Sequence, residues 1–427
     1  MKVYPMTLQQ EAMWLDDRMT EGPCRYLEPW VHRLTGAVDR SAVRWAWEAI
    51  VARHEALRTC YDLVDDQPVQ RVRPEGDPLA PVWCRSEEEA DERLRELVRA
   101  PMDLARGAVR ATLLETGADR AILVVQMHHI VLDDWALHIL DREFEEFYRA
   151  RTEGRPADVR PVPLQPGPYA LRQRSAPRDP AAMDYWRKNL ADLPDDADST
   201  LPADDGLPVS PGHGGRVEFT VGPEATRRLR RLAGRARVTP FTVFAAATAL
   251  LLHAARGAED LLVVTPVSLR GSADLDQMVA PLNNLLPLRL RVRPDDTFTG
   301  LLAQARARTH EAIEFRGVSI VDLVRWTRRR GRLGRNLYRT SVVLDDAADS
   351  GMDLPGVRAE RLFVFPGTSK FDLSFFFTAA DGGYTCMLDY ASDRYGAATA
   401  RRWTDRMLAL LDRCTTDPDG SVASLVG

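Results

Sequence analysis

The side chains best suited to acid–base chemistry are gathered in one stretch, QMHHIVLDDW at residues 126–135. An apolar run rich in valine and isoleucine ends in His128 and His129, and Asp133 and Asp134 follow at the expected start of a helix. A histidine can accept and return a proton near neutral pH. The stretch therefore indicates proton transfer at a substrate, although two strand-end histidines and a helix cap would explain the same residues without catalysis.

The two adjacent histidines argue against a metal centre. Neighbouring residues on a strand point to opposite faces of a sheet, so His128 and His129 cannot readily bind one ion together. The sequence has no H-E-x-x-H pattern, and its five cysteines include no C-x-x-C pair. We therefore expect no metal, with one histidine facing the core and the other facing a cavity.

The elements that must position this stretch alternate between strand and helix patterns. Within the first 150 residues we expect strands at 108–114 and 121–127 and helices at 41–53, 86–99 and 134–150. Ser41 is a good N-cap for the first of these helices. The strand that ends in the histidines and the helix that follows them would then hold the reactive groups.

Proline-dense segments at 154–180 and 194–212 separate this region from a second series of elements. The expected strands and helices of that series are, in order, 217–221, 240–255 (helix), 261–267, 285–292, 340–346, 372–379, 384–390 and 396–414 (helix). The whole pattern predicts an α/β chain with mixed sheets and two lobes, residues 1–165 and 166–427.

Composition excludes several other classes of protein. The chain has 427 residues, is 45% hydrophobic and has a net charge of -5, which allows a large core and gives no basic excess for nucleic acid. It contains no run of about 18 apolar residues that could span a membrane, and its N-terminus does not resemble a signal peptide. We expect a soluble, cytoplasmic monomer that binds neither nucleic acid nor membrane.

The segment HHIVLDDW resembles the H-H-x-x-x-D-G motif of the condensation domains of nonribosomal peptide synthetases. Other segments resemble further motifs of that family, in the same order along the chain. They are MTLQQEAMWL (6–15), HRLTGAVD (32–39), RHEALRT (53–59), DYWRKNLADLP (184–194), MVAPLNNLLPLRL (278–290) and KFDLSF (370–375). The resemblance extends over nearly the whole chain.

This resemblance implies two lobes of the chloramphenicol acetyltransferase-like fold, arranged as a V-shaped pseudo-dimer. It implies a free-standing enzyme that forms an amide or ester by attack of an amine or hydroxyl on an acyl or aminoacyl thioester. The donor would arrive on a carrier protein, and the acceptor on a second carrier or as a free small nucleophile. No cofactor would be bound intrinsically, because the carriers bring the phosphopantetheine arms that meet in a tunnel.

The resemblance also implies roles for single residues. His129, the second histidine of the motif, would be the catalytic group, as general base or by orienting the nucleophile, and His128 would support it. Asp133 would be structural and paired with Arg58 of RHEALRT. The tunnel would be lined by candidates from several segments: Asp134, Trp135, Asn284 and Ser374.

Asp134 departs from the family, which has glycine at this position. It could be a helix N-cap, a contact for a cationic nucleophile, or the mark of a lost activity. Both histidines are retained, so we expect an active enzyme.

Two other functions stay open. One is a non-catalytic module that docks carrier proteins or recruits a tailoring enzyme. The other is an acyl-CoA-dependent acyltransferase of the same fold, although the D-F-G-W-G loop of those enzymes is absent. The arginine-rich run at 325–335 could meet an acidic carrier, but a solvated loop is the simpler interpretation.

Overall fold

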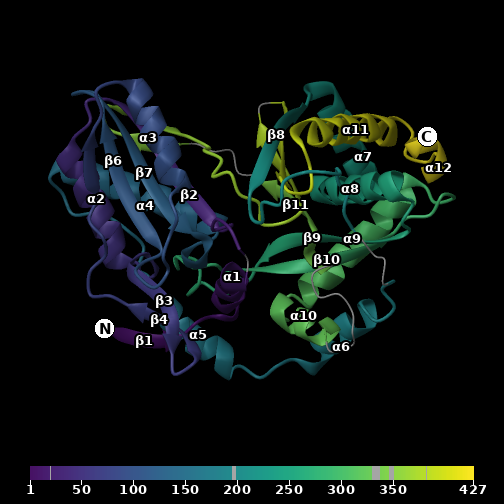
Figure 1. Cartoon of the computed structure of the whole chain (residues 1–427), viewed down its shortest axis with the longest axis horizontal. Coiled ribbons are helices and arrows are strands. Elements are labelled where there is room, and N and C mark those ends of the chain that lie inside the picture. Colours follow the sequence, from purple (N-terminus) through teal and green to yellow (C-terminus); the bar gives the residue numbers. More distant parts are fainter. Residues whose placement is uncertain (20, 195–198, 329–336, 346–350, 381) are drawn as a thin grey trace. The chain divides into compact units, whose positions relative to one another are not determined.

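The computed structural model describes residues 1–19, 21–194, 199–328, 337–345, 351–380 and 382–427 (Figure 1). The chain divides into two compact units. The first comprises Met1–Pro177, Arg270–Asn283 and Asp349–Thr368, and the second comprises Arg178–Leu269, Asn284–Ala348 and Ser369–Gly427.

This division differs from the single boundary predicted after residue 165. Helix α5 (Pro166–Ser175) belongs to the first unit, because its Gln173 side chain accepts a hydrogen bond from the Leu8 amide at 2.8 Å. Strand β13 (Val357–Arg361) also joins the first unit by pairing with a strand near the N-terminus. Proline content can indicate a linker, but it does not show that later segments of the chain pack against the first unit.

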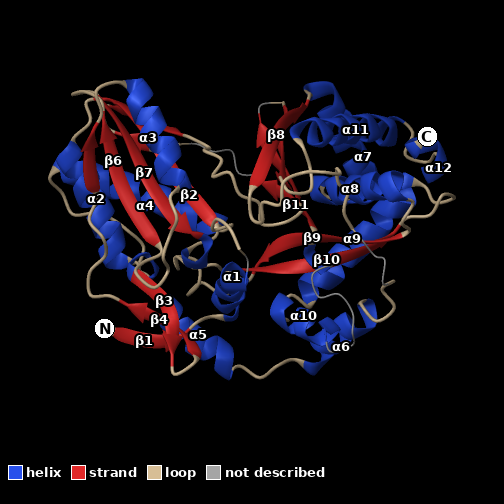
Figure 2. Ribbon diagram, viewed as in Figure 1, coloured by secondary structure: helices blue, strands red, loops and turns tan. Residues whose placement is uncertain are grey.

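The first unit is built on a six-stranded mixed sheet (Figure 2). Its order is β12 (Asp353–Leu354), β13, β2 (Leu27–Gly36), β7 (Arg120–His128), β6 (Val109–Glu115) and β5 (Ala80–Trp83). Only the β5–β6 pair is parallel among these pairings. A smaller antiparallel sheet contains β1 (Lys2–Pro5), β4 (Gln67–Val72) and β3 (Thr59–Val64). The strand that ends in the histidines is therefore central in its sheet.

Helices cover both faces of the six-stranded sheet. Alternate residues of β2 face opposite sides, so Trp30 packs with α2 (Arg40–Arg53) and α4 (Asp134–Glu153), whereas Val31 packs with α3 (Glu87–Arg99). The remaining helices of this unit are α1 (Leu8–Met19) and the short 3-10 turns η1 (Glu55–Arg58) and η2 (His129–Val131). Asp39 caps α2 through bonds from two amides, so the expected Ser41 cap is wrong.

The second unit has its own six-stranded mixed sheet. Its order is β10 (Asn283–Arg291), β9 (Asp260–Ser268), β11 (Thr340–Asp345), β14 (Leu373–Ala380), β15 (Gly383–Ala391) and β8 (Gly214–Val221). The described helices of this unit are α6 (Pro180–Asn189), α7 (Pro223–Ala236), α8 (Pro240–Arg256), α9 (Phe298–Glu314), α10 (Ile320–Arg328), α11 (Ala397–Thr416) and α12 (Val422–Val426). The predicted mixed α/β class is confirmed, and the V-shaped arrangement of the lobes stays a prediction.

Helix α8 forms the apolar centre of the second unit, as its composition predicts. Its side chains from Thr242 to His253 are buried among residues of the sheet and of α11. In the described part of the chain, no single helix is long and apolar enough to cross a membrane; α7 and α8 reach that length only together, and they meet at 103°.

Helix α4, which follows the two histidines, is held in the first unit by the buried carboxylate of Glu143 and the partly buried carboxylate of Asp141. Glu143 bonds His54 at 2.8 Å and Arg53 at 3.1 Å, and Asp141 bonds the Trp30 indole at 2.7 Å. Burial alone would raise the pKa of Glu143, but the hydrogen bonds and charges of His54 and Arg53 outweigh it and hold this pKa below its ordinary value. These contacts fix the helix whose first turn lies beside His129.

Glu143→Ala is expected to lower the free energy of unfolding by about 3–5 kcal/mol, because it leaves the buried His54 and the partly buried Arg53 without their carboxylate. The control, Glu145→Ala, removes a partly exposed pair with Arg149 on the same helix and should cost about 1 kcal/mol or less. Urea unfolding of both variants at neutral pH measures the difference. The gap should narrow as the pH falls below the ordinary glutamate pKa of about 4.3 and then through the lowered pKa of Glu143, where the carboxylate is protonated and the native pair is lost. Equal losses at neutral pH would contradict this assignment.

Candidate active site

His129 lies where the central strand β7 gives way to the turn η2. Its backbone amide donates to the Tyr26 carbonyl at 2.8 Å, and its Nδ1 lies 2.7 Å from the Leu132 carbonyl oxygen. A carbonyl oxygen only accepts, so Nδ1 must carry the proton and Nε2 keeps its lone pair in the neutral ring. The side chain is partly exposed. The fold therefore presents an imidazole with one basic nitrogen available.

His128 has the opposite tautomer. Its Nδ1 accepts a hydrogen bond from the Ile130 amide at 3.0 Å, so its proton is on Nε2, which lies 4.0 Å from a carboxylate oxygen of Asp17. The ring is fully buried and lies 5.6 Å from the ring of Tyr26. This burial agrees with the expectation for His128, while its supporting role stays a prediction.

Asp17, Cys24 and His128 are grouped closely enough to suggest a metal site, with their ligand atoms within 4.8 Å of one another. The tautomer of His128 argues against it, because Nε2 would have to lose its proton while Nδ1 already uses its lone pair for Ile130. Burial raises the pKa of Asp17, and a hydrogen bond from Cys24 partly opposes that rise. We assign no metal to this group and interpret it as a hydrogen-bonded support for His128.

Asp133 connects the motif to a segment far along the chain. Its Oδ1 caps α4 through the Ala136 amide at 2.9 Å and pairs with Arg270 Nη2 at 2.9 Å, and its Oδ2 accepts from the Leu282 amide at 3.0 Å. The side chains of Asp133 and Arg270 are 6% and 5% exposed. One carboxylate thus starts the helix and anchors both ends of the 270–283 segment.

The predicted pairing of Asp133 with Arg58 is wrong. Arg58 ends the turn η1, where it donates to the Arg73 carbonyl at 2.5 Å and lies 4.0 Å from Glu55. The Arg73 carbonyl and Glu55, and not Asp133, are its partners there. Arg270 was missed, because it stands in no charged motif and is 137 residues away from Asp133.

Asp134 and Trp135 form the exposed start of α4. Asp134 is its first residue and Asp133 its cap, so the interpretation of Asp134 as N-cap is wrong. Trp135 is 53% exposed and donates from its indole nitrogen to the Asp276 carbonyl at 3.0 Å. The Trp135 indole therefore lies against the 270–283 segment, and whether Asp134 and Trp135 line a tunnel stays a prediction.

Asn284 and Ser374 belong to the second unit and are buried, at 4% and 3% exposure. The Asn284 amide donates to the carbonyls of Arg316 and Val318 at 2.9 and 2.6 Å and accepts from the Ile320 amide at 3.3 Å. These bonds hold the 316–320 segment against β10, and whether Asn284 and Ser374 line a tunnel stays a prediction. Most of the arginine-rich run at 325–335 lies outside the described residues.

Arg270→Ala is expected to destabilise the chain by about 3–5 kcal/mol, because the buried Asp133 carboxylate loses its cation. Arg58→Ala, the matched control, should leave Asp133 paired and cost clearly less. Chemical unfolding of both variants compares the two losses. A larger loss for Arg58→Ala would restore the pairing that the sequence predicted.

The two histidine tautomers can be observed without any substrate. Long-range proton–nitrogen correlation spectra of protein labelled with ¹⁵N-histidine, at about pH 8 where an ordinary imidazole is neutral, should show His129 protonated on Nδ1 and His128 protonated on Nε2. His129→Ala and His128→Gln supply the assignments. The reverse pattern would remove the basic Nε2 on which the site depends.

The chain was compared with known proteins. The condensation-domain family model matches residues 1–426. The phosphinothricin tripeptide synthetase PhsB of Streptomyces viridochromogenes is 32% identical over 437 residues, covering 99% of this chain and 36% of that protein. A dimodular nonribosomal peptide synthase of Bacillus subtilis is 30% identical over 442 residues, covering 99% of this chain and 18% of that protein. The chain spans well under half the length of these relatives.

Two solved structures are similar over essentially the whole chain. The X-domain of teicoplanin biosynthesis, in complex with OxyB, has a TM-score of 0.87 and 26% identity, covering 100% of this chain and 96% of that one. The first condensation domain of the calcium-dependent antibiotic synthetase, with a substrate analogue, has a TM-score of 0.82 and 21% identity, covering 99% of each chain, which establishes a shared fold. The family match and this fold show that the chain belongs to the condensation-domain family of nonribosomal peptide synthetases, with its chloramphenicol acetyltransferase-like fold.

Proposed function

We propose that this chain is a condensation enzyme in which His129 promotes attack of an amine or hydroxyl on a carrier-tethered acyl or aminoacyl thioester. The observation that carries the proposal is the His129 tautomer. The hydrogen bond between Nδ1 and the Leu132 carbonyl leaves the lone pair of Nε2 for a substrate proton, on a partly exposed ring within the family motif.

The reaction needs one proton to move. As the nucleophile's nitrogen or oxygen bonds to the thioester carbonyl carbon, its proton passes to Nε2 of His129. Collapse of the tetrahedral adduct breaks the carbon–sulfur bond, and the leaving phosphopantetheine thiolate takes the proton from Nε2, which returns His129 to its neutral form. A positioned base of this kind typically contributes about 10²–10⁴-fold. An α-amino group, with a pKa of about 8, is partly neutral already and needs this help less than a hydroxyl does.

Other residues of the first unit act through His129 without touching substrate. The Ile130 bond to His128 and the Tyr26 bond to the His129 amide fix the turn that carries the imidazole. The Asp133–Arg270 pair fixes the start of α4 and the 270–283 segment beside it. The phosphopantetheine arm is part of the substrate in this scheme, and the enzyme contributes no cofactor.

A second candidate is a docking module without catalysis, supported by two observations. An aspartate, Asp134, replaces the family glycine, and the structure of an X-domain in complex with OxyB is similar to this chain at 26% identity. This candidate predicts that the wild-type chain binds a partner protein and makes no product from any loaded carrier. An acyl-CoA-dependent acyltransferase would instead show an equal kcat/KM for a CoA thioester and for the same acyl group on a carrier.

His129→Ala is expected to lower product formation at least about 100-fold while the protein stays folded, because the base is lost. His138→Ala provides the control, because His138 is an exposed histidine on α4. The measurement is intact-mass detection of carrier-bound product with panels of loaded carriers and amine or hydroxyl acceptors. Undiminished turnover by folded His129→Ala would exclude the catalytic role.

A further inference from the structure

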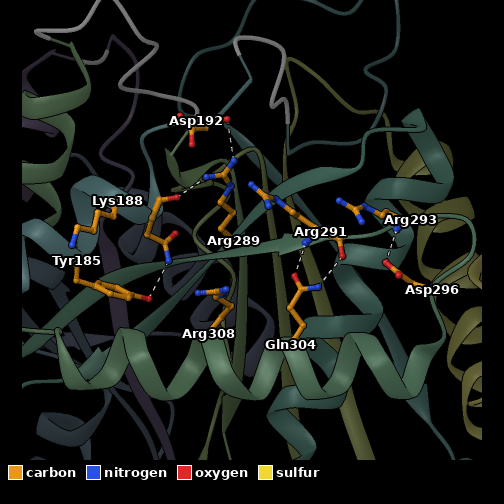
Figure 3. Close-up of a pocket in the computed structure, with 10 residues that line it drawn as sticks. Tyr185, Lys188, Asp192, Arg289, Arg291, Arg293, Asp296, Gln304 and Arg308 are labelled. Carbon is orange, nitrogen blue, oxygen red and sulfur yellow. Dashed lines mark hydrogen bonds between the residues drawn. The ribbon is translucent and has the colours of Figure 1, made fainter.

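The second unit contains a pocket of about 570 Å³ whose lining is strongly cationic (Figure 3). Its walls come from α6, from β10 with the residues that follow it, and from α9. Five of the ten lining residues carry a positive charge: Lys188, Arg289, Arg291, Arg293 and Arg308. The volume lies within the range of about 300–1,000 Å³ that is usual for small-molecule sites.

The alternation of β10 brings Arg289 and Arg291 to one face, and Arg293 follows two residues after the strand ends. Leu286, Leu288, Leu290 and Val292 are buried in the core, so the intervening odd positions face the other way. Side chains two residues apart on a strand are separated by roughly 7 Å. Arg289, Arg291 and Arg293 thus form a row, with Arg308 and Gln304 of α9 beneath it (Figure 3).

Some of this charge is already neutralised inside the protein. The buried Arg289 pairs with Asp260 at 2.6 and 2.7 Å and donates to the Asn189 carbonyl at 2.6 Å. Arg291 shares Asp260 at 3.3 Å, and Arg308 pairs with a glutamate. Arg289 is therefore a fixed wall of the pocket and is not available to a ligand.

The cations that are not neutralised inside the protein lie at the exposed rim of the pocket. Lys188 and Arg293 are exposed, and within the described residues no hydrogen bond or ion pair is found for either side chain. Two carboxylates, Asp192 and Asp296, also line the pocket. They lower the attraction of the pocket for any anion, so binding of an anion depends on the rim cations Lys188 and Arg293.

The Gln304 side chain occupies backbone groups at the edge of the sheet. Its side-chain amide accepts from the Arg291 backbone amide at 2.6 Å and donates to the Arg291 carbonyl at 3.0 Å. These are the backbone groups that an added peptide strand would use on this free edge of the sheet. With the Arg291 backbone groups occupied by Gln304, recognition at this end of β10 rests on cationic side chains.

We propose that this pocket binds a small molecule bearing two or more linked phosphate groups. Guanidinium forks pair with phosphate oxygens through charge-assisted hydrogen bonds. Arg291 and Arg293, two residues and roughly 7 Å apart, are separated by more than one phosphate spans, which suits a chain of phosphates. The site lies wholly within the second unit, so the proposal is independent of the reaction assigned to His129.

Isothermal titration of the full chain with tripolyphosphate and with orthophosphate tests the proposal. Tripolyphosphate should bind at one saturable site, and orthophosphate should bind at least about tenfold more weakly, because it reaches fewer of the cations. The double variant Lys188→Gln/Arg293→Gln should weaken tripolyphosphate binding by at least about tenfold, because both substitutions are exposed and remove rim charge. Arg227→Gln, an exposed arginine on α7 outside the pocket, is the control and should have no effect.

Three results would overturn the proposal. One is the absence of saturable tripolyphosphate binding by the folded wild-type chain. Another is an equal loss of affinity in the Arg227→Gln control, which would indicate only general charge attraction. The third is tighter binding of a polyglutamate peptide with the same dependence on Lys188 and Arg293, which would assign the pocket to an acidic protein.

Discussion

The buried carboxylate of Asp133 is the contact on which the organisation of the candidate site depends. It caps α4, pairs with Arg270 and accepts a hydrogen bond from the Leu282 amide. An unpaired carboxylate at 6% exposure would be costly, so the 270–283 segment must remain in place for the motif to be stable. The same contact sets where α4 begins, and hence where the turn that carries His129 must end. The stability of this region and the geometry of the candidate site therefore both depend on the Asp133 carboxylate.

Backbone groups orient the imidazole ring of His129. Leu132 accepts its Nδ1 proton, and Tyr26 accepts its amide proton. Backbone acceptors in a strand-to-turn junction have little freedom to move, so the direction of Nε2 is fixed before any substrate arrives. His128, one residue earlier, points into the core, and its Nδ1 accepts a hydrogen bond from the Ile130 amide. The period of a strand thus separates two adjacent histidines into a partly exposed one and a buried one.

Local patterns in the sequence predicted the mixed α/β class, the central strand ending in the histidines, and the helix that follows them. The strand at 121–127 and the buried helix at 240–255 were found as β7 and α8, because hydrophobic periodicity reports which face is buried. The errors concern contacts between distant segments. Local patterns do not report contacts between segments that are far apart in the sequence. Three features depend on such contacts: the partner of Asp133, the membership of 270–283 in the first unit, and the nearness of Asp17 and Cys24 to His128. The Ser41 cap failed because Asp39, two residues earlier, is an equally good cap by composition.

The central claim is that Nε2 of His129 takes the proton of the nucleophile, and chemical rescue tests it most directly. His129→Gly would leave a space for free imidazole beside a carrier-bound donor and its acceptor, with product formation followed in single turnovers by intact mass. The account predicts that a nearly inactive variant recovers activity in proportion to the concentration of neutral imidazole, while the wild-type rate does not change. A folded His129→Gly variant that keeps the wild-type rate without imidazole, or that gains nothing at any imidazole concentration, would contradict it.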